Sequence, residues 1–243
     1  MSMRIDVWSD VVCPWCFIGK RRLERALAGF AHADEVEVVY HSFLLDPDAP
    51  QEPVESVAES LGRKYGGGPD AGRAMVAQVG SVAAEEGLDF RLAEAQRAST
   101  VDAHRLLHLA LAEHGPAVQR ALKEELLSAY FLRAENPAAA DVLLAAAQRA
   151  GVDEDRAREV LAGTEFREQV FDDVDRAADL GASGVPFFVL DQRYAVSGAQ
   201  PAETFARALE QAWADGHPVL QPVGAPGDDS ASGAVCGPEG CTP

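Results

Sequence analysis

The stretch that decides the fold reads VWSDVVCPWCFIGK and spans residues 7–20. Before it, apolar and polar residues alternate, which predicts a short β-strand over residues 4–8. After it, apolar residues recur at helical spacing, which predicts a helix. Pro14 suits the first turn of a helix, where its missing N–H is no loss. Cys13 is therefore expected at a strand-to-helix junction, with Cys16 one turn further on.

The spacing of Cys13 and Cys16 suits disulfide exchange. The thiolate is the nucleophile in that reaction, and a free thiol with a pKa of about 8.5 is mostly protonated at neutral pH. A helix N-terminus offers unpaired N–H groups and the positive end of the helix dipole, so it favours a Cys13 thiolate. Cys16 could then attack a mixed disulfide at Cys13. We expect Cys13 to attack and Cys16 to resolve, with Trp15 as a substrate contact.

The remaining segments complete an α/β pattern. A second strand is expected over residues 35–45. Residues 54–180 are rich in Ala, Leu, Glu and Arg, and glycine and proline breaks divide them into about seven helical pieces. Strand character returns as a hairpin over residues 185–198, and a last helix follows from Pro201. This order predicts a thioredoxin-like fold interrupted by a large all-helical insertion.

The same pattern suggests three parts. Residues 1–50 and 183–217 are expected to form a discontinuous thioredoxin-like domain, and residues 54–180 a helical insertion domain. Residues 218–243 are rich in Gly, Pro, Asp and Ser without periodicity, so we expect a flexible tail that carries a CX4C pair.

Composition excludes several classes of partner. The chain has 243 residues and a formal net charge of −18, from 39 acidic and 21 basic side chains. Such a charge repels phosphate backbones and anionic lipids, so we expect neither a nucleic-acid nor a membrane partner. No uncharged apolar run approaches ~18 residues. Residues 1–8 lack the apolar stretch of a signal peptide, so we expect the cytosol, where structural disulfides are rare.

Metal binding is the main alternative use of the four cysteines. They form two close pairs, and the second pair, Cys236 and Cys241, could complete a zinc site with the first. Zinc sites more often use rigid turns, so we expect no metal and interpret the second pair as an auxiliary redox pair. Two alternatives stay open for Cys236 and Cys241: a tail disulfide without function, or weak binding of a metal ion. His104 and His108 lie four residues apart, but no third metal ligand is evident. We expect them to be structural histidines of a helix, with their ring nitrogens hydrogen-bonded within the fold.

Two motifs together resemble a known family. The chain resembles the DsbA family of thiol–disulfide oxidoreductases, in particular its FrnE-type branch. The resemblance rests on Cys13-Pro14-Trp15-Cys16, which opens a helix, and on Gly184-Val185-Pro186-Phe187, which precedes a hairpin. The resemblance covers about residues 4–216. It implies that Pro186 follows a cis peptide bond and faces the dithiol, and that Val185 offers backbone groups to an extended substrate. The alternative is a strand-starting proline without function.

The resemblance implies a cytosolic thiol–disulfide oxidoreductase without a separate cofactor. Its substrates would be protein or small-molecule disulfides, with glutathione or a thioredoxin system as candidate reductants. The rival is an enzyme like the kappa-class glutathione transferases or 2-hydroxychromene-2-carboxylate isomerases. Those enzymes usually place Ser where Cys13 stands and lack the partner at Cys16. A third alternative, a non-catalytic binding module, would require an idle dithiol. Trp15 replaces the basic residue of the strongly oxidising family members, so we expect a potential of roughly −270 to −120 mV.

Overall fold

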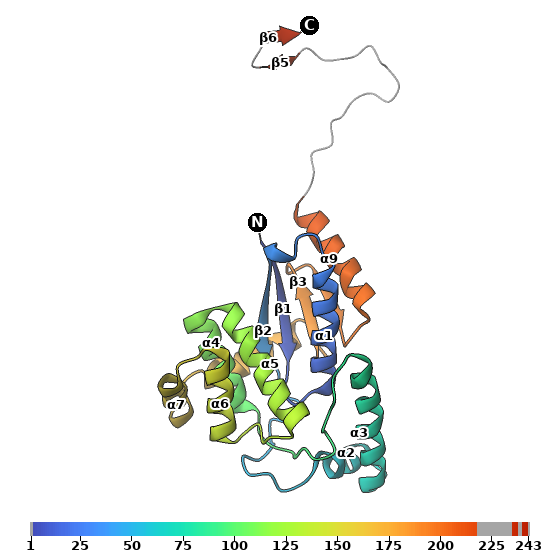
Figure 1. Cartoon of the computed structure of the whole chain (residues 1–243), viewed down its shortest axis with the longest axis vertical. Coiled ribbons are helices and arrows are strands. Elements are labelled where there is room, and N and C mark those ends of the chain that lie inside the picture. Colours follow the sequence, from blue (N-terminus) through green and yellow to red (C-terminus); the bar gives the residue numbers. More distant parts are fainter. Residues whose placement is uncertain (1, 218–234, 238–239, 243) are drawn as a thin grey trace.

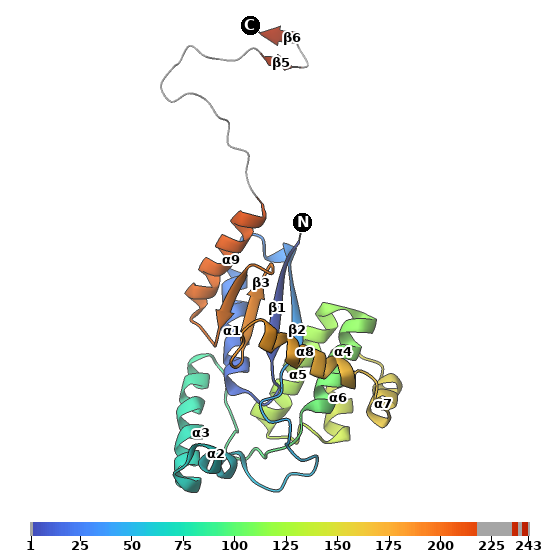
Figure 2. The same cartoon turned by 180° about the vertical axis from the view of Figure 1, so that it is seen from behind.

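The computed structural model describes residues 2–217, 235–237 and 240–242 (Figures 1 and 2). The elements are, in chain order, β1 (Met3–Ser9), α1 (Pro14–Ala28), the 3-10 turn η1 (Ala33–Glu35), β2 (Val36–Ser42), α2 (Val57–Tyr65), α3 (Gly68–Glu85), α4 (Val101–His114), α5 (Pro116–Arg133), α6 (Ala140–Ala150), α7 (Glu154–Ala162), α8 (Arg167–Asp179), β3 (Phe187–Leu190), β4 (Tyr194–Ser197), α9 (Ala202–Gly216), β5 (Val235–Gly237) and β6 (Gly240–Thr242). Over these residues, no helix combines the length and hydrophobicity needed to cross a membrane.

A four-stranded sheet in the order β2-β1-β3-β4 forms the centre of the molecule. Strand β1 runs parallel to β2 and antiparallel to β3, where Trp8 pairs with Phe187. Three residues connect β3 and β4, and the first two of them, Asp191 and Gln192, both have positive φ. The Arg193 N–H donates to the Leu190 carbonyl at 3.0 Å, as in a type I′ turn. Strands from before and after the insertion thus form one sheet, with α2–α8 inserted between β2 and β3 (Figure 1). The predicted α/β thioredoxin-like fold with a helical insertion is confirmed.

Helices cover both faces of this sheet. Helices α1 and α9 pack on one face, where Ile5, Phe188 and Phe205 belong to a common apolar core. Helix α8 crosses the opposite face (Figure 2), and the Trp8 indole N–H donates to the backbone oxygen of Asp173 in α8 at 2.9 Å. Because successive side chains of a strand point to opposite faces, β1 contributes Ile5 to one core and Trp8 to the other.

The second strand is shorter than the sequence predicted. It ends at Ser42, whereas the prediction extended it to Leu45. The backbone N–H of Leu45 donates to the Asp10 carboxylate at 2.9 Å, and Leu44 packs into a small apolar cluster with helical residues. Strand β1 also ends at Ser9, so the chain beyond β2 has no strand partner in β1.

Helix α5 covers the edge of the sheet at β2. Gln119 is fully buried in α5, and its amide pairs with both backbone groups of Tyr40. Its Oε1 accepts from the Tyr40 N–H at 2.9 Å, and its Nε2 donates to the Tyr40 carbonyl at 2.7 Å. Unpaired strand edges invite pairing with other chains. Here a side chain of the insertion fills the place that another strand would take.

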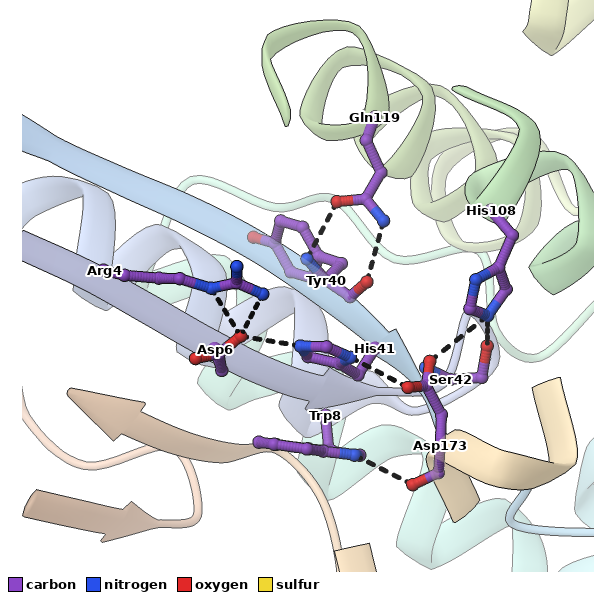
Figure 3. A network of polar contacts seen from close by, with 9 residues as sticks. All are labelled: Arg4, Asp6, Trp8, Tyr40, His41, Ser42, His108, Gln119 and Asp173. Carbon is purple, nitrogen blue, oxygen red and sulfur yellow. Dashed lines mark hydrogen bonds and ion pairs between the residues drawn. The ribbon is translucent and has the colours of Figure 1, made fainter. Parts of the chain in front are cut away.

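A polar network joins α8 and α4 to strands β1 and β2 (Figure 3). His41 lies between Asp6 and Asp173, with N–O distances of 2.7 and 2.9 Å. Burial alone would lower the pKa of His41, but the hydrogen bonds to Asp173 and Asp6 raise it. His108 Nε2 lies 3.0 Å from Ser42 Oγ and 3.2 Å from Asp173 Oδ2. Because one ring nitrogen makes both contacts, this set is not arranged like a serine-hydrolase triad, which uses both nitrogens.

Helices α2 and α3 form a tight hairpin at one end of the molecule (Figure 1). A Cβ at Gly72 would lie 1.8 Å from the carbonyl oxygen of Ala58, so only glycine permits this approach. Glu86, directly after α3, is paired with Arg22 and Arg25 of α1. These ion pairs anchor the end of the hairpin to the helix that carries the dithiol.

Candidate functional site

The two cysteines of the motif lie where the sequence placed them. Cys13 is the N-cap residue of α1, and Cys16 lies in the first turn, with its N–H donating to the Cys13 carbonyl at 3.0 Å. Both are free thiols, and each is 3% exposed. Cys13 makes no side-chain capping hydrogen bond. Its Sγ instead donates to the carbonyl oxygen of Val185 at 3.6 Å, which brings the loop before β3 against the dithiol.

The peptide bond between Val185 and Pro186 is cis. This loop is held close to α1, because a Cβ at Gly19 would lie 3.0 Å from Pro186 Cγ and 3.3 Å from Phe188 Cζ. On the other side, the N–H of Gly198 donates to the Pro186 carbonyl at 2.8 Å. The lack of a side chain at Gly19 therefore lets the helix of the dithiol and the proline loop meet.

A cavity of about 500 Å³ opens beside the dithiol. Its walls come from the start of α1, the chain after β2, helices α2 and α3, and the loop before β3. Cys13, Trp15 and Val185 line this cavity, whereas Cys16 and Pro186 do not. The site is therefore asymmetric, with one thiol facing the cavity and the other behind it.

A buried lysine lies behind the thiols. Lys123 of α5 has no exposed surface, and its Nζ donates to the carbonyl oxygen of Ser9 at 3.1 Å. The ammonium also lies 5.6 Å from the centre of the Tyr40 ring, within the range of a cation–π contact. Burial lowers the pKa of Lys123 to about 8. The lysine is therefore mostly charged at neutral pH.

A buried carboxylate lies next to the motif as well. Asp10 is 1% exposed and accepts hydrogen bonds from the N–H groups of Val11 at 2.7 Å and Leu45 at 2.9 Å. Its Oδ1 lies 3.2 Å from Nε2 of His104. Burial would raise the pKa of Asp10, but the hydrogen bonds from His104 and the backbone hold it below its ordinary value. Burial lowers the pKa of His104, so this histidine is neutral as a structural partner of the carboxylate.

The two thiols titrate as a coupled pair, so their proton losses belong to the pair. The hydrogen bond to Cys16 and burial raise the pKa of Cys13, and the charge of Asp10 adds to this effect. Burial opposes a Cys16 thiolate too, but the hydrogen bond from Cys13 and the charge of Lys123 lower the Cys16 pKa. Of the two thiols, Cys16 therefore has the lowered pKa and Cys13 the raised one. The sequence argument favoured a Cys13 thiolate because it weighed only the helix N-terminus.

Sequence reasoning missed Asp10 and Lys123, although both leave a signal. Lys123 precedes Leu126 and Tyr130 by three and seven residues, so it shares the apolar face of its helix. A lysine at such a position is buried when the helix packs. Asp10 is an acidic residue between a buried strand and the apolar Val11-Val12 pair. Neither signal indicates that the two charges meet at the dithiol.

The predicted auxiliary pair lies in the last two strands. Strands β5 and β6 pair antiparallel, with Cys236 opposite Cys241 in the register. Their side chains and residues 218–234 lie outside the described part of the chain. The auxiliary role of this pair stays a prediction.

Comparisons with known proteins identify the family of the chain. The chain matches the model of the DSBA-like thioredoxin domain over residues 4–210. The crystal structure of the probable DsbA oxidoreductase SCO1869 from Streptomyces coelicolor is 42% identical, with a TM-score of 0.82, and the match covers 99% of this chain and 98% of that one.

Two further matches are weaker. The cytosolic disulfide reductase DsbM from Pseudomonas aeruginosa, solved with GSH, is 18% identical with a TM-score of 0.57, covering 86% of this chain and 98% of that one. This likeness shows the fold alone. YwbO of Bacillus subtilis is 45% identical over 47 residues, which are 19% of this chain and 22% of that protein's length. The family match and the Streptomyces structure decide the assignment: the chain belongs to the DSBA-like thioredoxin domain family.

Proposed function

We propose that this protein is a thiol–disulfide oxidoreductase of the FrnE-type branch that works through Cys13 and Cys16. Membership of the DsbA-like family supports thiol–disulfide exchange in general. The observation that carries the assignment to this pair is its asymmetry. Cys13 lines the cavity beside the cis-proline loop, while Cys16 lies behind it, where Lys123 lowers its pKa. Cys13 is thus the attacking thiol and Cys16 the resolving one.

Cys13 must lose its proton before it can attack, because the thiolate is the nucleophile. Cys16, whose pKa is the lower of the two, accepts that proton when it is ionised. The Cys13 thiolate then attacks one sulfur of a substrate disulfide. A bond forms between Cys13 and that sulfur, the substrate S–S bond breaks, and the other substrate sulfur leaves as a thiolate.

Resolution returns the site to a disulfide. The Cys16 thiol gives its proton to the leaving thiolate, and Lys123 stabilises the Cys16 thiolate that results. Cys16 attacks the Cys13 sulfur, so the Cys13–Cys16 bond forms and the second substrate sulfur departs as a thiolate. Two electrons pass from the dithiol to the substrate. Run in reverse, the same steps oxidise a substrate dithiol.

We place this reaction in the cytosol and propose that glutathione or a thioredoxin system restores the dithiol, without a separate cofactor. The fold neighbour from Pseudomonas aeruginosa is named as a cytosolic disulfide reductase and was solved with GSH. Cys236 and Cys241 are a further proposed exchange partner, which the register of β5 and β6 supports by bringing the two backbones opposite each other.

Trapping the mixed disulfide tests the assignment of the two roles. The Cys16→Ser variant cannot resolve the adduct, so a peptide disulfide should accumulate as a covalent adduct on Cys13, located by mass spectrometry after digestion. The matched Cys13→Ser variant should form little adduct because its remaining thiol does not line the cavity. Equal trapping by Cys13→Ser, or none by Cys16→Ser, would overturn the assignment of Cys13 as attacking and Cys16 as resolving thiol.

A further inference from the structure

His41 in β2 lies between two carboxylates that come from different elements (Figure 3). Its Nε2 is 2.7 Å from Asp6 Oδ1 in β1, and its Nδ1 is 2.9 Å from Asp173 Oδ1 in α8. A neutral imidazole carries one N–H and can donate to only one of these oxygens, whereas an imidazolium donates to both. The two distances therefore describe a charged ring that joins α8 to the sheet.

The charges around this imidazole favour its protonated form. Burial would lower its pKa, but the hydrogen bonds to Asp173 and Asp6 raise it above the ordinary value of 6.5. Burial would raise the pKa of the two carboxyls, but hydrogen bonds hold both below their ordinary values, so they stay ionised. Two further ionisable side chains reach the same carboxylates, Arg4 of β1 on Asp6 and His108 of α4 on Asp173. From α5, the side chain that reaches β2 is the uncharged Gln119.

His41 is connected to the dithiol through Trp8. The imidazole stacks on the Trp8 indole, with ring centroids 4.5 Å apart and planes inclined by 17°. Trp8 belongs to the small apolar cluster against which Val185 packs. The Val185 carbonyl oxygen accepts from Cys13 Sγ at 3.6 Å. A single apolar cluster thus connects the histidine to the residue that contacts the thiol.

Helix α8 holds the start of the loop that leads to Val185. The Asp173 carboxylate, which contacts the His41 ring, lies in the middle of this helix. One turn further along, the Ala177 carbonyl accepts from the N–H of Ala182 at 2.9 Å, so the loop is bound to the end of the helix. A weaker contact between the histidine and α8 therefore loosens the loop as well.

We propose that His41 is a positioning residue for disulfide exchange at Cys13: as an imidazolium it holds the loop of Val185 and Pro186 against the thiol, and as a neutral ring it releases the loop. The proposal rests on the proposed function and adds a regulation of the same site. A neutral ring turns a lone pair toward one of its two carboxylates. The join between α8 and the sheet is therefore complete below pH 6.5 and is lost as the pH rises through the raised pKa of His41.

The test compares two rates of mixed-disulfide formation with one peptide disulfide, from pH 5 to pH 9. One rate belongs to the full-length Cys16→Ser protein, the other to its Cys16→Ser/His41→Gln counterpart, whose amide, like the neutral ring, donates to only one carboxylate. Thiol ionisation accelerates both proteins as the pH rises and cancels in the ratio. The ratio should be roughly 10 at low pH and approach one above the His41 pKa, which NMR of labelled histidine measures. His114→Gln is the control, because that exposed histidine at the end of α4 should leave the rate unchanged.

Two further measurements separate positioning from a purely structural role. Asp6→Asn keeps an oxygen opposite His41 Nε2 but removes one of the two negative charges, so the His41 pKa should fall. The drop in the ratio, measured against the same variant with His41→Gln, should move to lower pH with it. The N–H of Gly198 donates to the Pro186 carbonyl at 2.8 Å, so its protection from hydrogen exchange reports the position of the loop. This protection should fall as His41 loses its proton.

A rate ratio that stays constant with pH, or a drop that does not follow the His41 titration in Asp6→Asn, would overturn the proposal. If His41→Gln fails to fold, the protection of the Gly198 N–H in the unaltered chain decides, since constant protection across the His41 titration overturns the proposal too. If no mixed disulfide forms at any pH while iodoacetamide still alkylates Cys13, the proposed function itself fails, which separates the two conclusions.

Discussion

Replacing Lys123 with Met is expected to stabilise the protein and to weaken its thiol pair. The pKa of Lys123 is lowered from 10.5 to about 8, and one pKa unit corresponds to about 1.4 kcal/mol. Holding the lysine charged in the folded state at pH 7 therefore costs about 3 kcal/mol. Methionine loses the hydrogen bond to the Ser9 carbonyl, which is worth about 1 kcal/mol. A net gain of about 2 kcal/mol is expected.

The gain should depend on pH with a definite sign. The folded pKa lies below the unfolded one, so the unfolded chain binds the proton more tightly and the penalty is fully present below pH 8. As the pH rises from 8 to 10.5 the folded lysine loses its proton first, and the penalty falls away. At pH 10 about 1 kcal/mol of it is left, which the lost hydrogen bond offsets. The variant and the wild type should then be equally stable.

Urea unfolding of the reduced proteins at pH 7 and pH 10 measures this difference, and the pH dependence of alkylation by iodoacetamide measures the thiol pair. Without the lysine charge, the pKa of Cys16 should rise. Lys64→Met is the control, since that exposed lysine should change stability by less than about 0.5 kcal/mol. A Lys123→Met variant that is no more stable at pH 7, with an unchanged alkylation profile, would refute a charged lysine behind the dithiol.

Four other measurements probe the site and its surroundings. The reduction potential of the main dithiol should lie at roughly −270 to −120 mV when equilibrated with glutathione buffers, and a value outside that interval would contradict the role assigned to Trp15. Asp10→Asn should shift the alkylation profile of the thiols to lower pH, because the carboxylate raises the Cys13 pKa; a shift to higher pH would contradict this. Gly72→Ala should destabilise the chain by about 1–3 kcal/mol in urea unfolding, because the added methyl group would overlap the Ala58 carbonyl oxygen. An unchanged unfolding midpoint would contradict this close approach of α2 and α3. Replacing Cys236 and Cys241 with Ser should slow insulin reduction without preventing formation of the mixed disulfide at Cys13. Unchanged turnover would contradict the proposed exchange between the tail pair and the main dithiol.

The dithiol and the fold could be predicted because their signals are local. Pro14 at the start of a helix and Cys16 one turn behind Cys13 are read directly from neighbouring residues, and strand and helix periodicities gave the order of elements. Even so, β2 was predicted to end three residues later than it does. The apolar run after Ser42 resembles a strand, but its residues pack against helices of the insertion instead.

The electrostatics of the site could not be predicted in the same way. The pKa of Cys16 depends on Lys123, which reaches the dithiol only when α5 packs against β2. The pKa of Asp10 depends on His104 from α4. These partners lie about a hundred residues from the motif, and a single sequence does not show which distant residues come into contact. The motif indicates thiol chemistry, but a lysine of the insertion lowers the pKa of one of the two sulfurs, that of Cys16.

The place of β1 in the sheet has a consequence for synthesis of the chain. Trp8 pairs with Phe187, so one side of β1 has no partner until about 180 further residues have left the ribosome. At 5–20 residues per second this takes roughly 10–40 s. During that time the loop of Val185 cannot cover Cys13. The nascent chain therefore exposes Cys13 before it has the loop that contacts this thiol in the folded protein.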